Sequence, residues 1–171
     1  MFYISPLKTQ DYVSVKDIFN LTFKQEGVPV ETLGYRWRNR LRSDSLGIYT
    51  YHGDLIGFAI ISDGVHCQVQ KQKKVHVKEV EKPSMSRYLS LLALHPAFRG
   101  TSIGSQLLTT ILKNTVAADK SLCLFPLDNV RLQEWYKRNG FYESVKTYFN
   151  FHHHYTRNHA KYLDKINSCH H

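Results

Sequence analysis

The segment from Leu91 to Gly104 has the residue types of a turn that binds phosphate between a strand and a helix. It reads LLALHPAFRGTSIG, in which an apolar run ends at His95 and Pro96 and is followed by an arginine and two glycines. The first N–H groups of a helix lack partners within the helix and lie at the positive end of its dipole, so they bind anions. We predict that this turn holds a diphosphate and that Arg99 pairs with its charge.

The helix that follows the turn is predicted to begin near Thr101 or Ser102, because either hydroxyl could cap it. Apolar residues recur behind this point at helical spacing and give the helix one apolar face: Ile103, Leu107, Leu108, Ile111, Leu112 and Val116. The turn lacks the lysine of a P-loop and the three glycines of a dinucleotide turn, which excludes those two nucleotide sites. An ordinary strand-to-helix connection without a ligand is the alternative.

A second segment of interest lies at residues 121–144, SLCLFPLDNVRLQEWYKRNGFYES. An apolar run leads to Asp128 and Asn129, which are typical of a helix start. A short amphipathic stretch then ends at Asn139 and Gly140, before a new aromatic run. We therefore predict a strand, a short helix and a further strand in this order.

Both segments match motifs of one known family. The pattern R/Q-x-x-G-x-G/A falls on residues 99–104. The pattern N-x-x-A-x-x-F-Y-x-x-x-G-F falls on Asn129, Leu132, Trp135, Tyr136, Gly140 and Phe141. Over residues 88–161 the chain thus resembles the acetyl-CoA-binding half of the GCN5-related N-acetyltransferases (GNAT). It departs from the family at Ser102, where glycine is usual, and at Leu132, where alanine is usual.

The resemblance implies an α/β (α+β) GNAT-like fold, with a mostly antiparallel mixed sheet of about six to seven strands, splayed at its centre and flanked by about four helices. It implies acetyl-CoA as acetyl donor and cosubstrate, and transfer to a primary amine of a protein amino terminus, a lysine or a small molecule. The positions that would bind acetyl-CoA are the backbone of Leu92, Ala93 and Leu94, the turn residues Arg99, Gly100, Thr101, Ser102, Ile103 and Gly104, and Asn129 and Tyr136.

Tyr136 is the candidate general acid, because it matches the family's tyrosine and a phenol can donate a proton to a departing thiolate. The alternative is that Tyr136 only forms the buried side of a short helix. The base is open. Tyr88 resembles the tyrosine that starts this strand in protein amino-terminal acetyltransferases, whereas Leu124 stands where those enzymes have histidine. Ser90 stands where many family members have an acidic residue, so a proton relayed through water is the other route.

Two other classes of function stay open. A Cβ at Ser102 restricts the backbone and narrows the space for a diphosphate, which would suit a catalytically weak module that binds acyl-CoA or a protein partner. A net charge of +9, from 23 basic and 14 acidic residues, would suit a nucleic-acid-binding protein. The charge is spread along the chain, however, and its densest clusters at residues 36–42 and 71–74 are short. Nucleic acid is therefore the less favoured partner.

The elements that must position these residues follow from the apolar pattern. The near-continuous run YLSLLAL indicates a central strand, buried on both faces, at residues 87–95. Other strands are predicted at residues 2–5, 47–51 and 55–62 and from residue 122, and helices at 11–23 and 30–41. Two final antiparallel strands are predicted in FYESVKTYFNF and HAKYLDKI.

A single domain is predicted over residues 1–171, with a polar, basic insertion at about 63–86. In the family, the acceptor is usually bound by segments that correspond here to residues 24–33, 63–86 and 148–158. The insertion would also suit an extended or acidic peptide. The acceptor amine and the oligomeric state stay open, a homodimer included.

Composition bounds the remaining partners. Cys67, Cys123 and Cys169 lack paired spacing, which predicts free thiols and a soluble protein in the reducing cytoplasm. No apolar run is long enough to span a bilayer, so no membrane partner is expected. The histidines at 152–154 and 159 have no cysteine or carboxylate at fixed spacing, so no metal site is predicted.

Overall fold

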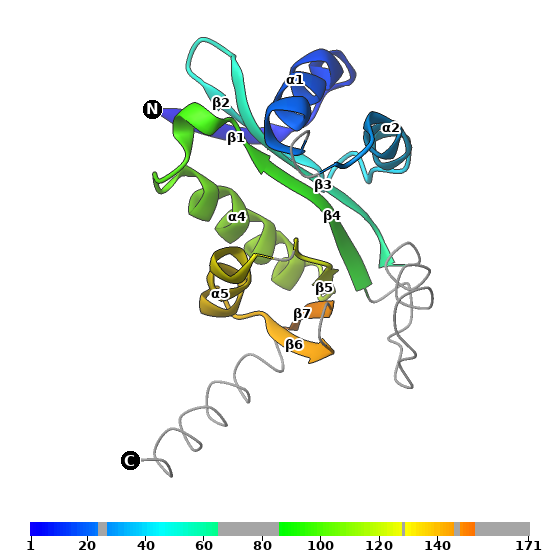
Figure 1. Ribbon diagram of the computed structural model, residues 1–171. Coiled ribbons are helices and arrows are strands. Elements are labelled where there is room, and N and C mark those ends of the chain that lie inside the picture. Colours follow the sequence, from blue (N-terminus) through cyan, green and yellow to red (C-terminus); the bar gives the residue numbers. More distant parts are fainter. Residues whose placement is uncertain (24–26, 65–85, 128, 146–147, 153–171) are drawn as a thin grey trace.

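The computed structural model describes residues 1–23, 27–64, 86–127, 129–145 and 148–152 (Figure 1). Seven strands form one sheet: β1 Phe2–Pro6, β2 Leu46–Thr50, β3 Leu55–Asp63, β4 Ser86–Leu94, β5 Ser121–Leu124, β6 Tyr142–Val145 and β7 Tyr148–His152. The α-helices are α1 Tyr12–Phe23, α2 Val30–Arg38, α4 Ile103–Ala117 and α5 Val130–Arg138, and the 3-10 helices are η1 Thr9–Asp11 and η4 Pro96–Phe98. This is the predicted mixed α/β fold.

The sheet has the order β1-β2-β3-β4-β5-β7-β6. Only β4 and β5 run parallel, and the other neighbouring pairs are antiparallel. The connection from β4 to β5 contains α4, as a parallel pair requires a crossover. The predicted mostly antiparallel sheet is therefore confirmed.

β4 and β5 pair over a short stretch and then part. Ser86 lies opposite Ser121, Arg87 opposite Leu122 and Tyr88 opposite Cys123. β5 ends at the next residue, whereas β4 continues to Leu94. This is the predicted splay at the centre of the sheet, and it leaves one edge of β4 without a strand partner in the described part of the chain.

β4 also contains a β-bulge at Ser90. Ile60 of β3 lies opposite Leu91, whereas Ile61 lies opposite Leu89, so Ser90 is an extra residue. Side chains alternate between the faces of a strand, and one extra residue reverses that alternation. Leu89 therefore packs on the face covered by α4 and α5, and Leu91 on the face covered by α1 and α2.

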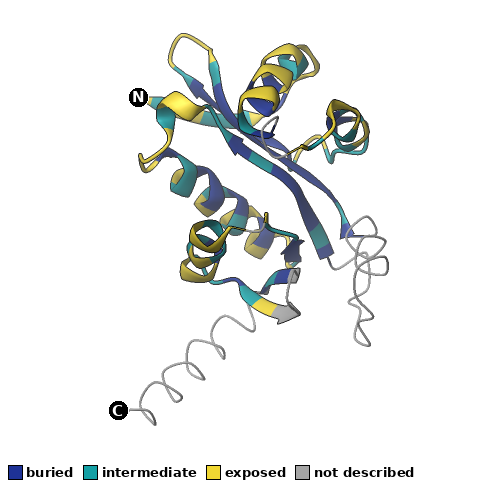
Figure 2. Cartoon of the chain, in the orientation of Figure 1, coloured by how far each residue is buried: buried dark blue, intermediate teal, exposed yellow. Residues whose placement is uncertain are grey.

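The sheet separates two hydrophobic cores (Figure 2). One contains the apolar side of α4 together with Tyr136, Phe141 and Phe149. The other contains the inward sides of α1 and α2, with Phe19 and Trp37 against Phe58 of β3. Because both faces are covered, the central strands are buried almost continuously, as the sequence of β4 predicted.

Helix α4 follows the predicted apolar pattern except at one position. Ile103, Leu107, Leu108 and Ile111 are buried, but Val116 is 43% exposed, and Thr115 points inward instead. The buried hydroxyl of Thr115 donates a hydrogen bond of 2.8 Å to the carbonyl of Ile111, which satisfies it. The prediction that Val116 lies on the buried face of this helix was wrong. Thr115 takes the buried position instead, which is possible because its hydroxyl has a hydrogen-bond partner within the helix.

The prediction of a single final strand in FYESVKTYFNF was also wrong. This segment contains β6 and all of β7 except His152, and the two strands pair antiparallel with Tyr142 opposite Asn150. Two strands therefore form within this aromatic run, and β7 lies between β5 and β6 because it pairs with both. The segment HAKYLDKI and most of the insertion at residues 63–86 lie outside the described residues.

The prediction of free thiols does not hold for Cys123, whose sulfur is in a disulfide. Cys67 and Cys169 lie outside the described residues. The cysteine pattern therefore no longer supports a reducing compartment, and the cytoplasmic location stays a prediction.

Among the described helices, none combines the length and the apolar composition of a membrane span, and the described residues contain no cluster of three metal-ligating side chains.

We expect Leu108→Ala to lower the free energy of unfolding by about 2 to 5 kcal/mol, because it leaves a cavity at a fully buried position of α4. Val116→Ala on the same helix removes a largely exposed side chain and should change stability by less than about 0.5 kcal/mol. Urea denaturation of the two variants measures both values. Equal losses would contradict the observed orientation of α4.

Candidate active site

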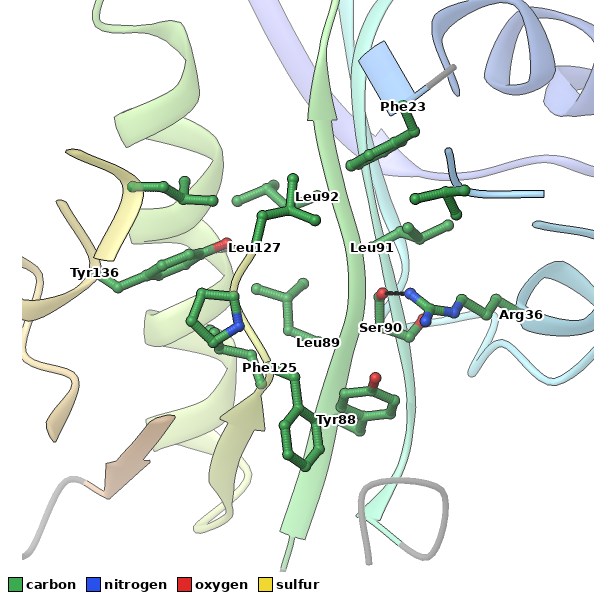
Figure 3. Close-up of a pocket in the computed structure, with 14 residues that line it drawn as sticks. Phe23, Arg36, Tyr88, Leu89, Ser90, Leu91, Leu92, Phe125, Leu127 and Tyr136 are labelled. Carbon is green, nitrogen blue, oxygen red and sulfur yellow. Dashed lines mark hydrogen bonds between the residues drawn. The ribbon is translucent and has the colours of Figure 1, made fainter. Parts of the chain in front are cut away.

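A cavity of about 240 Å³ lies where β4 and β5 part (Figure 3). Residues 88–92 of β4 and residues 124–127 form its walls, and α1, α2 and α5 each contribute side chains. The described lining is mainly apolar and aromatic, and its polar side chains are Arg36, Tyr88, Ser90 and Tyr136. A largely apolar cavity with a few polar groups is typical of a site that orients a small ligand.

Tyr136 is both a core residue and a cavity residue. It is 5% exposed, and its ring makes edge contacts with Phe141 and Phe149 at centroid distances of 5.3 and 6.4 Å. Its hydroxyl points toward β4 in the cavity (Figure 3). Burial raises the pKa of this phenol well above its ordinary value of 10.0, so it keeps its proton at neutral pH. The two interpretations of Tyr136 drawn from the sequence are therefore compatible.

Tyr88 lies in the same cavity, at the last position where β4 pairs with β5. It is 4% exposed and contacts Phe125 edge to face. Burial raises the pKa of its hydroxyl, and the positive charge of Arg36 opposes that rise in part. Leu124, where related enzymes have histidine, lines the cavity beside it. The structure thus brings Tyr88, Tyr136 and Leu124 together and offers no charged base among the described lining residues.

The stretch of β4 beyond its pairing with β5 supplies backbone groups to this site. Buried N–H and C=O groups require partners, and the carbonyl of Ser90 receives a hydrogen bond from Nη1 of Arg36. Residues 92–94, predicted to bind the cofactor through their backbone, lie further along the same strand. A ligand placed between β4 and the segment after β5 could pair with this edge.

The predicted diphosphate turn has glycine where the backbone needs it. Gly100 has a φ of +78°, in the left-handed region, and a Cβ there would meet no atom within 4 Å. Ser102 has φ −75° and ψ −1°, which any residue adopts. Its exposed hydroxyl receives a hydrogen bond of 3.0 Å from Nε2 of Gln106. Backbone conformation therefore gives no reason to require glycine at Ser102.

Helix α4 begins at Ile103, close to the predicted start. The Ser102 hydroxyl makes no capping bond, whereas Oγ1 of Thr101 accepts a hydrogen bond of 3.4 Å from the Ile103 N–H. A Cβ on Gly104 would have only the Leu94 side chain within 4 Å, at 3.9 Å. The helix end thus has open space in front of it, with the exposed Arg99 just before it. These features fit a diphosphate.

Asn129 has the structural role at a helix start that the sequence predicted. It is the N-cap of α5, and its Oδ1 accepts a hydrogen bond of 3.1 Å from the Leu132 N–H. Trp135 on the same helix donates from Nε1 to Oγ of Ser105 at 3.4 Å, which connects α5 to α4. The cap and this contact hold the helix that carries Tyr136. Contact between Asn129 and the cofactor stays a prediction.

This geometry agrees with comparison to known proteins. A family model described as "Acetyltransferase (GNAT) domain" matches residues 43–143, more than half of the chain. The chain belongs to the GNAT acetyltransferases. The predicted family is therefore confirmed, and two of the solved structures that share its fold contain acetyl-CoA or coenzyme A. No curated protein matches the sequence.

Solved structures share the fold at low sequence identity. A GNAT family acetyltransferase from Brucella melitensis, in complex with acetyl-CoA, is 19% identical with a TM-score of 0.64, covering 89% of this chain and 88% of that one. The ribosomal-protein-S18-alanine N-acetyltransferase from Escherichia coli is 17% identical with a TM-score of 0.64, covering 88% and 93%. The PaiA N-acetyltransferase from Thermoplasma acidophilum, in complex with coenzyme A, is 16% identical with a TM-score of 0.60, covering 89% and 99%.

Sequence reasoning missed the role of Arg36 in this GNAT site. Its sequence context suggested only a basic cluster on a helix, since RWRNRLR carries no signal that separates one arginine from the next. In the structure, Arg36 reaches the cavity and Arg40 lies over the Trp37 ring at 4.0 Å. Of the acceptor segment 24–33, Val28 lines the cavity but Leu33 is a core residue.

We expect Ser102→Gly to change the dissociation constant for coenzyme A by less than about twofold, or roughly 0.4 kcal/mol, because Ser102 is unstrained and exposed. Gly100→Val in the same turn forces a β-branched residue to a positive φ, at a cost of about 1 to 2 kcal/mol, and should weaken binding about tenfold. Isothermal titration calorimetry measures both. Tenfold tighter binding by the Ser102 variant would show that its side chain narrows the site.

Proposed function

We propose that this protein is an active N-acetyltransferase that moves the acetyl group of acetyl-CoA to a primary amine. The observation that carries the proposal is the protonated, buried Tyr136 hydroxyl in the cavity where β4 and β5 part. When bound, acetyl-CoA supplies a thioester whose carbonyl carbon a neutral amine can attack. The protein must then align the two reactants, stabilise charge on the carbonyl oxygen and protonate the departing sulfur.

The proposed donor site runs from the turn at Arg99 to the cavity. N–H groups at the start of α4 and the Arg99 guanidinium would bind the diphosphate. The backbone of residues 92–94 would pair with the extended arm of the donor between the strands. We assign Tyr136 as the general acid, because a phenol that keeps its proton can donate it to the thiolate. Asn129 would act mainly by holding the first turn of α5.

The amine proton has no strong acceptor among the described lining residues. Tyr88 has a raised pKa, so its hydroxyl is neutral at pH 7 and serves as a hydrogen-bonding group rather than as a base. We infer that the acceptor binds as the neutral amine, or loses its proton to water. Tyr88 would then orient the amine, which is a narrower role than the catalytic one predicted from its position.

We expect Tyr136→Phe to lower kcat for acetyl transfer by about 100-fold or more, within the range for loss of a general acid. The dissociation constant for coenzyme A should change less than about threefold, because the ring keeps its aromatic contacts. Release of free thiol, followed with each of several amine acceptors, measures the rate, and mass spectrometry identifies the product.

Tyr51→Phe is the matched control, since Tyr51 is 71% exposed in the turn between β2 and β3. It should retain the kcat of the original protein. Full activity of the Tyr136 variant would remove the proposed acid. Binding of coenzyme A without acetylation of any amine would instead support the non-catalytic binding module.

We expect kcat/KM to rise with pH as the acceptor amine loses its proton and to show no descending limb below about pH 10. The neutral form of Tyr136 is the active acid. Burial raises its pKa, so that form persists to higher pH than for an exposed tyrosine. A pH profile measured from pH 6 to 10 tests this expectation. A descending limb near pH 8 would show that another group is the acid.

A further inference from the structure

The cavity reaches both faces of the sheet. Tyr136 approaches from the α5 side and Arg36 from the α2 side, and the two lie on opposite sides of β4 in Figure 3. The diphosphate turn belongs to α4, which covers the same face as α5. The side lined by α1 and α2 is therefore the side from which the acceptor would approach.

Arg36 brings a positive charge to the acceptor side. It is the only charged side chain among the described residues that line the cavity. One Nη donates to the carbonyl of Ser90, while a guanidinium has five N–H donors in all. No carboxylate in the described ranges forms an ion pair with it, in contrast to Arg87, which pairs with Asp44 at 3.5 Å.

We propose that Arg36 determines acceptor specificity and that the acceptor is a small apolar amino acid or a close analogue, an amine that also carries a carboxylate. The guanidinium binds the carboxylate, and the amine is directed toward the gap between β4 and β5. This proposal rests on the proposed acetyl transfer and adds the chemical class of its acceptor.

Charge favours this class. A guanidinium pairs with a carboxylate through parallel hydrogen bonds, and it repels an ammonium group. A polyamine or a lysine-rich peptide would bring further positive charge to Arg36, whereas an amino acid brings the opposite charge. The nearby cation also favours the neutral form of the acceptor amine, which is the form that attacks.

The field of Arg36 already acts on a neighbouring group in the cavity. Burial alone would raise the pKa of the Tyr88 hydroxyl, and Arg36 opposes that rise by stabilising negative charge there. An acceptor carboxylate placed at the same end of the cavity would be stabilised by the same charge.

Size and wall chemistry narrow the acceptor further. A volume of about 240 Å³ is below the usual range of about 300 to 1,000 Å³ for ligand pockets. It must also admit the acetyl end of the donor, which leaves room in the cavity for only a small acceptor group beside the reacting amine. Phe23, Val28 and Leu91 line this side and would contact an apolar side chain.

The test compares matched acceptors that differ only in the carboxylate. Leucine, methionine and phenylalanine are each assayed against their primary amides, and binding of the N-acetylated acids and amides to the coenzyme A complex is measured by calorimetry. We expect the acids to be favoured about 10- to 100-fold in kcat/KM and in affinity, the range for a hydrogen bond to a charged group. The amides have the less basic amine, so amine reactivity alone would favour them.

Arg36→Gln removes the charge but keeps a donor for the Ser90 carbonyl. It should reduce the preference for acids to within about threefold, mainly through a higher KM for the acids. Arg36→Lys keeps the charge and should retain part of the preference. Arg38→Gln is the control, because Arg38 is exposed on the same helix. Thermal unfolding checks that each variant is folded.

The outcomes separate this inference from the proposed function. Acetylation of amides or of peptide amino termini in preference to free acids would overturn the inference and support the transferase. Selective binding of the N-acetylated acids without turnover of any amine would support the inference and overturn the transferase. A preference for acids that persists in Arg36→Gln would show that Arg36 only positions β4.

Discussion

The loss of pairing between β4 and β5 after Tyr88 is the constraint on which the site depends. Three residue pairs hold the two strands together, and beyond them β4 is paired with β3 on its other edge only, among the described strands. Since a buried backbone edge requires hydrogen-bond partners, this arrangement is stable only if side chains or a ligand supply them. In this stretch of β4, Arg36 satisfies the carbonyl of Ser90, the extra residue of the bulge. The opening in the sheet therefore creates the cavity and also determines which groups must enter it.

Because of the β-bulge at Ser90, side chains on both faces of the sheet are held next to the opening between β4 and β5. It reverses the alternation of side chains, so that Leu89 anchors β4 in the α4 and α5 core while Leu91 anchors it in the α1 and α2 core. Both cores are tightly buried, which holds Tyr136 on one side of the strand and Arg36 on the other. Donor and acceptor can thus meet at the gap without sharing one face of the sheet.

The predictions from sequence succeeded where the signal is local. The apolar run of β4, the apolar spacing of α4 up to Ile111 and the Asn129 helix start all reflect interactions within a few residues. They failed at Thr115, where the carbonyl of Ile111 one turn earlier in α4 satisfies a buried hydroxyl, and in the final hairpin, where pairing with β5 decides the strand order. The expectation that Ser102 restricts the backbone was wrong, since its backbone angles are ordinary and the positive φ of this turn occurs at Gly100.

By itself, the sequence determined the family, the order of most elements and the residues of the turn before α4, because motif spacing and apolar periodicity are properties of neighbouring positions. Only the tertiary structure decided that Arg36 reaches a cavity beside Tyr88, that burial raises the pKa of Tyr136, and that β4 changes register at Ser90. Each of these depends on burial or pairing between segments distant in the chain. A charge or a hydroxyl has no defined role until folding sets its surroundings.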